Sequence, residues 1–352
     1  AAMSRSTAKQ LVASVLASNF VAPLTLPFAR DSATIFMMHR FADPDRGNWG
    51  HDLTALRRHL EHLRRNRYDL VSLTELRDRL ASPVARLAKT VAFTIDDGYA
   101  DYATAAAPVF EAFDCPATVF VVTGVVDDGG WYWWDRVRVA FERAAQRALS
   151  LELGPTALRM TWSAADSLSA ARSLVETLKD VPDAERRRIV NALPELVHAD
   201  VGERPPAAYA SMTWDEIRRC GARLTTFGPH TVTHPILART TDDVARFEMT
   251  ESWRRLSAET NAAVPVFCYP NGEADDAGSR EFSIARDAGL EMAVTTRPGY
   301  ATRASWAAHA DARYSMPRFP YPEDTLQFIQ MINGVERVKM AIRSSLRSRG
   351  SA

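Results

Sequence analysis

The chain has 352 residues, of which 46% are hydrophobic and 24% are charged, a composition typical of a globular protein with a substantial core. Its 43 basic and 43 acidic side chains cancel, which argues against nucleic acid as a partner. Three cysteines do not make a disulfide framework, and we interpret them as buried free thiols. This cysteine usage agrees with a reducing compartment, so we expect a cytoplasmic protein.

Residues 1–32 are predicted to form an N-terminal helical segment in front of the main domain. The partly apolar stretch at residues 11–27 follows two basic residues and weakly resembles a signal peptide, which keeps export or membrane association open. Asn19, Pro23 and Pro27 interrupt this stretch, so it lacks the run of about 18 apolar residues that a spanning helix needs. We therefore favour a short helix packed on the domain and expect no transmembrane span.

Strand and helix patterns alternate along the main domain, residues 33–324. Helical patterns occur at residues 51–65, where four leucines share one face, and at residues 102–113. Short, continuous apolar runs predict buried strands at residues 33–41, 90–95, 117–122, 223–227, 264–269 and 291–295. Repeated strand–helix units predict a parallel sheet with helices outside it, either open or closed into a barrel.

Residues 128–212, approximately, interrupt this alternation and are predicted to be a helical insertion. No strong strand pattern occurs there, whereas residues 165–179 and 183–193 have helical patterns. The aromatic run WYWW at residues 131–134 either stacks on sugar rings or anchors the insertion to the rest of the domain. After the main domain, residues 325–352 are predicted to form a basic, solvated C-terminal helix, with peripheral membrane contact as the alternative.

Two adjacent carboxylates, Asp96 and Asp97, directly follow the predicted strand at residues 90–95. The C-terminal ends of parallel strands are where α/β folds place their active sites. Because like charges repel, a bound metal ion would offset the cost of placing two carboxylates together. The alternative interpretation is a simple Asp-Gly turn that begins a helix.

A histidine pair, His230 and His234, lies in the sequence GPHTVTHP after the predicted strand at residues 223–227. The spacing of four residues places both imidazoles on one side of a turn, where they can hold one metal ion. One carboxylate with two imidazoles is a three-ligand set that leaves coordination positions open for water and substrate.

These motifs resemble those of the polysaccharide deacetylase (NodB-homology, carbohydrate esterase family 4) family. FTIDDGYADY resembles the family's TFDDG motif, GPHTVTHP its His-Ser/Thr-x-x-His motif, and VFCYPNGE its FxYPxG motif. MMHRF before the first motif and PATVFV after it also fit the family pattern. The order and spacing of these motifs argue strongly against a chance match.

The resemblance implies an α/β fold, a distorted (β/α) barrel of the NodB-homology type that carries the helical insertion. It also implies a divalent metal, zinc in many members, although other divalent ions suit carboxylate and imidazole ligands. Matched by position, Asp97, His230 and His234 would be the metal ligands. Asp96 would be the general base, and Tyr269 would offer its backbone N–H to the oxyanion.

Two departures from the family pattern concern the partners of the base. The family's usual third motif contains an arginine that orients the base; residues 264–267 offer none, and Arg318 in MPRF is the candidate substitute. The usual C-terminal Leu-x-His motif, which supplies the acid, is absent after residue 309. We therefore assign the acid to His39, as in some members, with a packing role as the alternative and His309 as a weaker candidate.

The sequence thus predicts a metal-dependent hydrolase that removes N-acetyl groups from an amino sugar of a polysaccharide or glycolipid. Asp96 would deprotonate a metal-bound water, the metal and a backbone donor would hold the oxyanion, and His39 would protonate the leaving amine. An O-acetyl esterase, another amide hydrolase on this scaffold and a non-catalytic carbohydrate-binding relative are the alternatives. Retention of Asp96 argues against a pure binding protein, which needs no base.

Overall fold

The computed structural model describes residues 30–154 and 156–337. Most of the predicted N-terminal segment and the end of the predicted C-terminal helix therefore lie outside the described residues. Within the described ranges, no helix has the length and apolar character that crossing a membrane would require. Cys115, Cys220 and Cys268 are all buried and free, as predicted.

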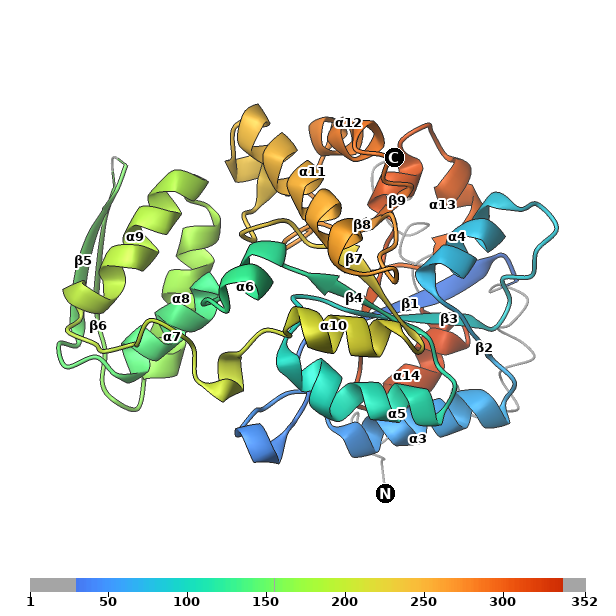
Figure 1. Cartoon of the computed structure of the whole chain (residues 1–352), viewed down its shortest axis with the longest axis horizontal. Coiled ribbons are helices and arrows are strands. Elements are labelled where there is room, and N and C mark those ends of the chain that lie inside the picture. Colours follow the sequence, from blue (N-terminus) through green and yellow to red (C-terminus); the bar gives the residue numbers. More distant parts are fainter. Residues whose placement is uncertain (1–29, 155, 338–352) are drawn as a thin grey trace, which may run out of the picture.

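A parallel sheet forms the centre of the molecule (Figure 1). Its neighbouring strands are β1 (Ser32–Met38), β3 (Thr90–Ile95), β4 (Ala117–Val121) and β7 (Thr225–Pro229). Every residue of β3 and β4 is buried, which their continuous apolar sequences require in a sheet covered on both faces. Short strands extend the sheet: β2 (Asp69–Leu70) beside β3, and β10 (Ala301–Thr302) and β11 (Phe319–Pro320) beside β1.

A second, two-stranded parallel sheet consists of β8 (Val266–Cys268) and β9 (Met292–Val294). Single bridges, Phe227–Ala263 and Val294–Met316, connect it to β7 and to the segment that leads into β11. Gly228 allows the close approach of β7 and β8, because a Cβ there would lie 2.4 Å from the Val266 carbonyl oxygen. The strands thus follow one another in an α/β arrangement that matches a distorted NodB-type barrel.

Helices surround these strands on the outside (Figure 1). Local sequence marks some of their first residues: the Asp52 carboxylate accepts a hydrogen bond from the Thr54 N–H at the start of α3, and Thr213 with Glu216 forms a capping box. The outer helices are α3 (Leu53–Arg65), α4 (Leu73–Ala81), α5 (Ala107–Ala112), α6 (Thr123–Asp128), α10 (Trp214–Gly221), α11 (Asp242–Glu259), α12 (Ser279–Asp287) and α13 (Arg303–Ala307).

The prediction of a solvated C-terminal helix is wrong for its described part, α14 (Thr325–Ile332). Phe328 and Ile332 are buried in the main core, and the Phe328 ring stacks on Phe36 of β1 at 5.2 Å. Apolar side chains on one face thus make the first two turns a core element. The basic end of the predicted helix lies outside the described residues.

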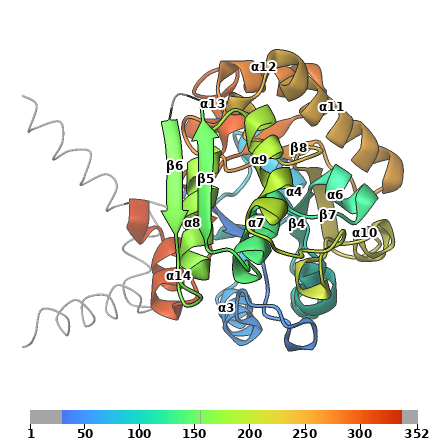
Figure 2. The same cartoon turned by 90° about the vertical axis from the view of Figure 1, so that its left-hand side faces the viewer.

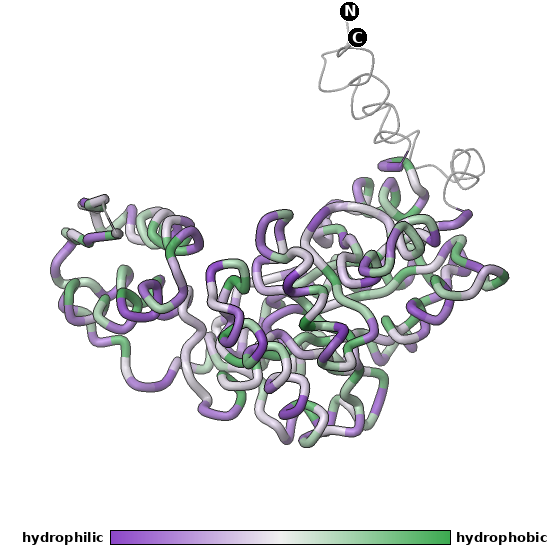
Figure 3. Tube along the Cα trace, turned by 90° about the horizontal axis from the view of Figure 1, so that it is seen from above, coloured by the Kyte–Doolittle hydropathy of each residue, from purple (hydrophilic) through white to green (hydrophobic). Residues whose placement is uncertain are grey.

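The insertion projects as a lobe to one side of the strands (Figures 1 and 3). The helical patterns correspond to α8 (Ser167–Lys179) and α9 (Asp183–Leu196), which follow α7 (Trp133–Glu142). The expectation of an insertion without strands is wrong. The strands β5 (Ala148–Leu153) and β6 (Thr156–Thr161) form a hairpin against α8 (Figure 2), and the alternating Leu149 and Leu151 of β5 point into the insertion's own core.

Candidate active site

A cavity of about 420 Å³ opens at the C-terminal ends of the strands. His39 follows β1, the two adjacent aspartates follow β3, the histidine pair follows β7 and Tyr269 follows β8. Parallel strands present their carboxyl ends at one edge, so residues far apart in sequence meet there. The predicted site residues that line this cavity are His39, Asp96, Asp97, His230, His234 and Tyr269.

Three potential metal ligands converge in this cavity. Asp97 Oδ1 lies 3.6 Å from His230 Nε2 and 3.4 Å from His234 Nε2, and the two Nε2 atoms are 3.2 Å apart. Ligand atoms at about 2.0–2.2 Å from a shared ion have mutual separations of this size. The Nδ1 of His230 hydrogen bonds to the Cys268 carbonyl oxygen at 2.7 Å, which leaves Nε2 free to act as the ligand atom.

The backbone holds these ligands in conformations that are rare for residues with a side chain. Asp97 has φ of 72° and His234 has φ of 58°, both in the left-handed region. Gly98 continues the first turn with φ of 77°, and a Cβ there would lie 2.7 Å from Val121 Cγ1. Such backbone strain persists where surrounding structure enforces it, and it is concentrated at functional sites.

The protonation states of Asp97 and His234 suit a cation, whereas, against the effect of burial, Cys268 and the two aspartates raise the pKa of His230 above its usual range, so this imidazole must lose a proton when an ion binds. Burial opposes ionisation of Asp97, but the neighbouring imidazoles of His230 and His234 outweigh it and hold the pKa of Asp97 well below its usual range. Burial lowers the pKa of His234 to about 4, so this imidazole is neutral near pH 7. An ionised carboxylate and a neutral imidazole are the forms that bind a metal ion.

Asp96 lies beside this group but has a different partner. Arg318, which is fully buried, donates to both of its carboxylate oxygens, from Nη1 at 2.7 Å and Nη2 at 2.8 Å. Burial raises the pKa of a carboxyl, but this bidentate pair outweighs it and holds the pKa of Asp96 below its usual range. Arg318 also donates to the Thr94 hydroxyl and the Thr295 carbonyl, so the guanidinium itself is fixed.

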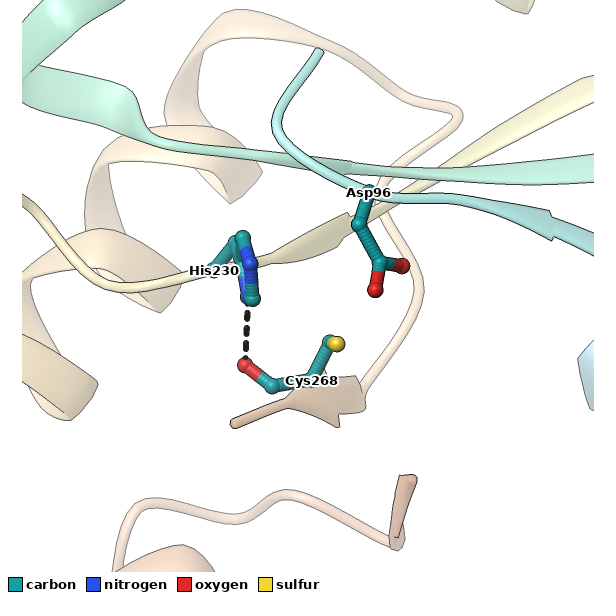
Figure 4. A group of neighbouring side chains, drawn as sticks. All are labelled: Asp96, His230 and Cys268. Carbon is teal, nitrogen blue, oxygen red and sulfur yellow. Dashed lines mark hydrogen bonds between the residues drawn. The ribbon is translucent and has the colours of Figure 1, made fainter. Parts of the chain in front are cut away.

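Asp96, which follows β3, His230, which follows β7, and Cys268 of β8 form a second cluster of potential ligands (Figure 4). This cluster fits a cation poorly. Arg318 occupies both oxygens of Asp96 and also approaches the Cys268 sulfur at 3.2 Å. Burial raises the pKa of the Cys268 thiol, and a protonated thiol is a weak ligand. The residues present therefore fit a metal ion at Asp97, His230 and His234.

His39 lies at the mouth of the cavity, with 46% of its side chain exposed and Nε2 3.9 Å from Asp96 Oδ2. His39 thus lines the same cavity as Asp96 and lies directly beside it. The weaker candidate, His309, is exposed in a turn and does not line the cavity.

Tyr269 lines the cavity, but its predicted backbone donor is engaged. The N–H of Tyr269 donates to the Val294 carbonyl oxygen at 3.4 Å, near the upper limit for such a bond. An oxyanion could therefore accept a hydrogen bond from this N–H only if the weak hydrogen bond between Tyr269 and Val294 were broken. The Tyr269 hydroxyl is buried and has no hydrogen-bond partner among the described residues.

The family profile described as "Polysaccharide deacetylase" matches residues 84–150 and 201–293. Over these two segments the chain matches the polysaccharide deacetylase family, and the match identifies it as a hydrolase of the carbohydrate N-deacetylase class. The gap between the two matched segments falls within the insertion, so this lobe is where the deacetylase departs from the family pattern.

Three solved structures resemble the deacetylase. They are the Streptococcus pyogenes deacetylase PplD in complex with acetate (17% identity, 86% of this chain and 98% of that chain, TM-score 0.55), IcaB from Ammonifex degensii (15%, 86% and 97%, 0.52) and a de-N-acetylase from Aggregatibacter actinomycetemcomitans (13%, 84% and 97%, 0.50). At these identities the likeness establishes a shared fold. None of the curated protein sequences matches the chain significantly.

The aromatic run at the start of the insertion both supports and lines the deacetylase's cavity. The buried Tyr132 donates its hydroxyl hydrogen to the Asp97 carbonyl oxygen at 2.8 Å. Trp134 packs edge-on against the His234 ring at a centroid distance of 4.5 Å, and its Nε1 donates to the Tyr99 hydroxyl. The sequence left anchoring and sugar stacking open; the contacts establish anchoring, and Trp133 and Trp134 also line the cavity.

Several residues of the site were not found from the sequence. Lys179, at the end of α8, lines the cavity although it lies 82 residues after Asp97. The Tyr99 hydroxyl donates to the Asp135 carboxylate at 2.5 Å and accepts a hydrogen bond from Trp134 Nε1, so this pair holds Trp134 in place. No local pattern indicates these contacts, because they depend on how the insertion docks on the strands.

Proposed function

We propose that the deacetylase hydrolyses the N-acetyl group of an amino sugar in a polysaccharide or glycolipid, with a divalent metal held by Asp97, His230 and His234. One observation carries this proposal: a buried carboxylate and two imidazoles converge beside a second, ionised carboxylate in the same cavity. A pure binding site needs no such base. The family match supports the acetylated carbohydrate as substrate.

The metal ligands support one chemical contribution. A divalent ion bound there, zinc by the usual preference for such donors, would act as a Lewis acid on the acetyl carbonyl and favour deprotonation of the attacking water. The chain's part is to fix the ligands before substrate arrives. Cys268 orients the His230 ring through its carbonyl, and Tyr132 holds the Asp97 turn.

Asp96 would take the proton from the attacking water. Its pKa lies below the usual range, so it is ionised near pH 7. The pairing with Arg318 lowers its basicity but fixes its position, and position is the first requirement of a general base. Once protonated, a weakly basic carboxylate releases its proton readily, so Asp96 needs a further proton acceptor nearby.

His39 would receive that role and protonate the leaving nitrogen. Its Nε2 lies 3.9 Å from Asp96, so a proton can move between the two after a small rotation or through one water. An amine is a poor leaving group unless it is protonated as the C–N bond breaks. The half-exposed position of His39 allows it to reach both the carboxylate and the sugar nitrogen.

Acetate release from N-acetylated oligosaccharides, measured on metal-stripped protein with Zn²⁺ added back, tests the proposal. We expect no acetate without metal and full activity near one equivalent of ion. O-acetylated glycans of the same backbone serve as the comparison. Turnover by the stripped protein, or release from the O-acetyl substrates alone, would contradict the proposed reaction.

A further inference from the structure

A second cavity, of about 270 Å³, lies behind the active site, between the insertion and the strands. Trp133, Trp134 and His234 line both cavities, so the two cavities adjoin each other. The remaining wall comes mainly from α7 and α9, two helices of the insertion. The metal-ligand histidine is thus shared between the catalytic cavity and a pocket that the proposed reaction does not use.

Four buried N–H donors on the wall of this second cavity have no acceptor. They belong to residues that line it: Trp133 Nε1, Arg136 Nε, Arg186 Nε and His234 Nδ1. No acceptor for them is present in residues 30–154 or 156–337. A buried donor without a partner is costly and therefore rare. Trp133 Nε1 and the two arginine Nε atoms can only donate, and His234 Nδ1 carries the hydrogen when Nε2 faces a metal ion, so the missing partner is a group that accepts several hydrogen bonds.

The charges around this cavity point to an anion. Arg136, Arg186 and Arg187 line it, and the one acidic residue on its wall is the exposed Glu203. Arg186 forms an ion pair with Asp183, whereas neither Arg136 nor Arg187 pairs with a carboxylate in the described part of the chain. Two guanidinium charges therefore remain uncompensated beside the unpaired N–H groups.

Arg186 is held in place before any ligand arrives. Its side chain is 4% exposed, its guanidinium lies 4.7 Å from the centre of the Trp133 ring, and Nη1 donates to the His234 carbonyl at 3.4 Å. These contacts fix two edges of the guanidinium and leave Nε unpaired. A fixed guanidinium recognises an oxyanion with little further loss of conformational freedom.

We propose that this cavity binds a phosphoryl group, either a phosphate or a phosphodiester. A phosphoryl group offers up to four oxygens in a tetrahedral arrangement and carries one or two charges, which matches several separate donors and two unpaired guanidiniums. A carboxylate offers two oxygens in one plane. The rest of the bound ligand would extend toward solvent past the exposed Arg187.

If the phosphoryl group belongs to the substrate, the amino sugar carries a phosphate, as lipid-linked and nucleotide-linked sugars do. This assignment of the substrate rests on the proposed function. A free phosphate would satisfy the same donors. In both cases the phosphoryl oxygen would accept from His234 Nδ1 and thereby orient the ring whose Nε2 faces Asp97.

Calorimetric titration of inorganic phosphate into the metal-loaded full chain tests the site itself. Arg187→Gln is the first variant, because Arg187 is exposed and its loss leaves the core intact. Arg188→Gln is the matched control: it removes the same charge from the next position of α9, where the side chain is 66% exposed and outside the cavity. We expect Arg187→Gln and Arg136→Gln each to weaken phosphate binding about tenfold, and Arg188→Gln to have no effect. Equal binding by all four proteins, which phosphate on the metal alone would give, overturns the proposal.

Kinetics then identify the source of the phosphoryl group. We expect a lower KM for a polyprenyl-diphosphate-linked or nucleoside-diphosphate-linked N-acetylglucosamine than for a neutral oligosaccharide, and Arg187→Gln should abolish this difference while Arg188→Gln keeps it. An unchanged preference in Arg187→Gln overturns the substrate assignment. Arginine-dependent phosphate binding without acetate release from any substrate would instead overturn the proposed function and leave the phosphoryl site standing.

Discussion

The distorted barrel and the insertion contribute to the same cavity in different ways. The barrel places ionisable groups at the C-terminal ends of β3 and β7, where Asp96, Asp97 and His230 meet within a few ångströms. The insertion has its own hydrophobic core and adds aromatic and basic side chains to the wall, among them Trp133 and Lys179. The proposed reactive groups therefore all come from the barrel, whereas both parts of the chain contribute to the wall around them. Substitutions in the barrel should lower kcat, and those in the insertion should act mainly on KM or stability.

The largest effect is expected for Asp96→Asn in the barrel. It removes the proposed base but none of the three proposed metal ligands, so metal content should stay near one ion while kcat falls by about 10²–10⁴-fold. Asp97→Asn should lose both the ion and turnover. Metal analysis of the two purified variants beside the kinetics makes the comparison. Equal loss of metal by both variants would show that the division between these neighbours is wrong.

His39→Ala should lower amide hydrolysis by roughly 10²-fold, because the leaving amine loses its proton donor. Hydrolysis of 4-nitrophenyl acetate should change little, since that leaving group departs without protonation. His309→Ala, at an exposed position outside the cavity, is the control. A His39→Ala protein with full amide activity would return His39 to a packing role.

Much of the barrel could be predicted from local sequence, because buried parallel strands are continuous apolar runs and the reactive residues directly follow them. Arg318 was a candidate only because the usual arginine is missing from residues 264–267. The short distance between His39 and Asp96, in contrast, depends on where side chains lie across two neighbouring strands. The spacing of residues along the chain does not predict it.

The insertion was predicted less well, for physical reasons. The strand β5 alternates leucine with polar residues over only six positions, a short signal from a residue that also favours helices. Arg186 and Arg187 belong to a run of three arginines that resembles the solvated face of a helix. One of them is buried against Trp133 because α9 packs on the start of α7, a contact that sequence periodicity does not reveal.

A smaller effect is expected where the insertion supports the barrel. Tyr132→Phe removes the hydroxyl that donates to the Asp97 carbonyl and leaves a buried acceptor unpaired, at a cost of about 1–3 kcal/mol in the free energy of unfolding. At saturating metal kcat should change little, whereas the concentration of metal needed for half activity should rise by roughly tenfold. Tyr209→Phe, at a partly buried tyrosine whose hydroxyl forms no hydrogen bond with the residues that the structure describes, should change neither the stability nor this concentration. Equal behaviour of the two variants would mean that the insertion does not hold the ligand turn.

The smallest effect is a pH dependence of stability that arises in the insertion. Burial raises the pKa of Asp135 to about 7, although the hydrogen bond from Tyr99 opposes this. Between pH 4 and 7 the folded protein thus keeps a proton that the unfolded chain has released, so Asp135 makes stability fall as pH rises through this range. Asp135→Asn should flatten this slope in thermal unfolding measured from pH 4 to 7. An unchanged slope would show that Asp135 is ionised throughout.

The proposal that Asp97, His230 and His234 hold one divalent ion is tested most directly by anomalous scattering from crystals of the metal-loaded protein. The account predicts a single strong peak within about 2.0–2.2 Å of Asp97 Oδ1 and of both Nε2 atoms, with Asp96 outside the coordination sphere and still paired to Arg318. A peak at Asp96 and Cys268, or a metal bound away from these residues, would contradict it.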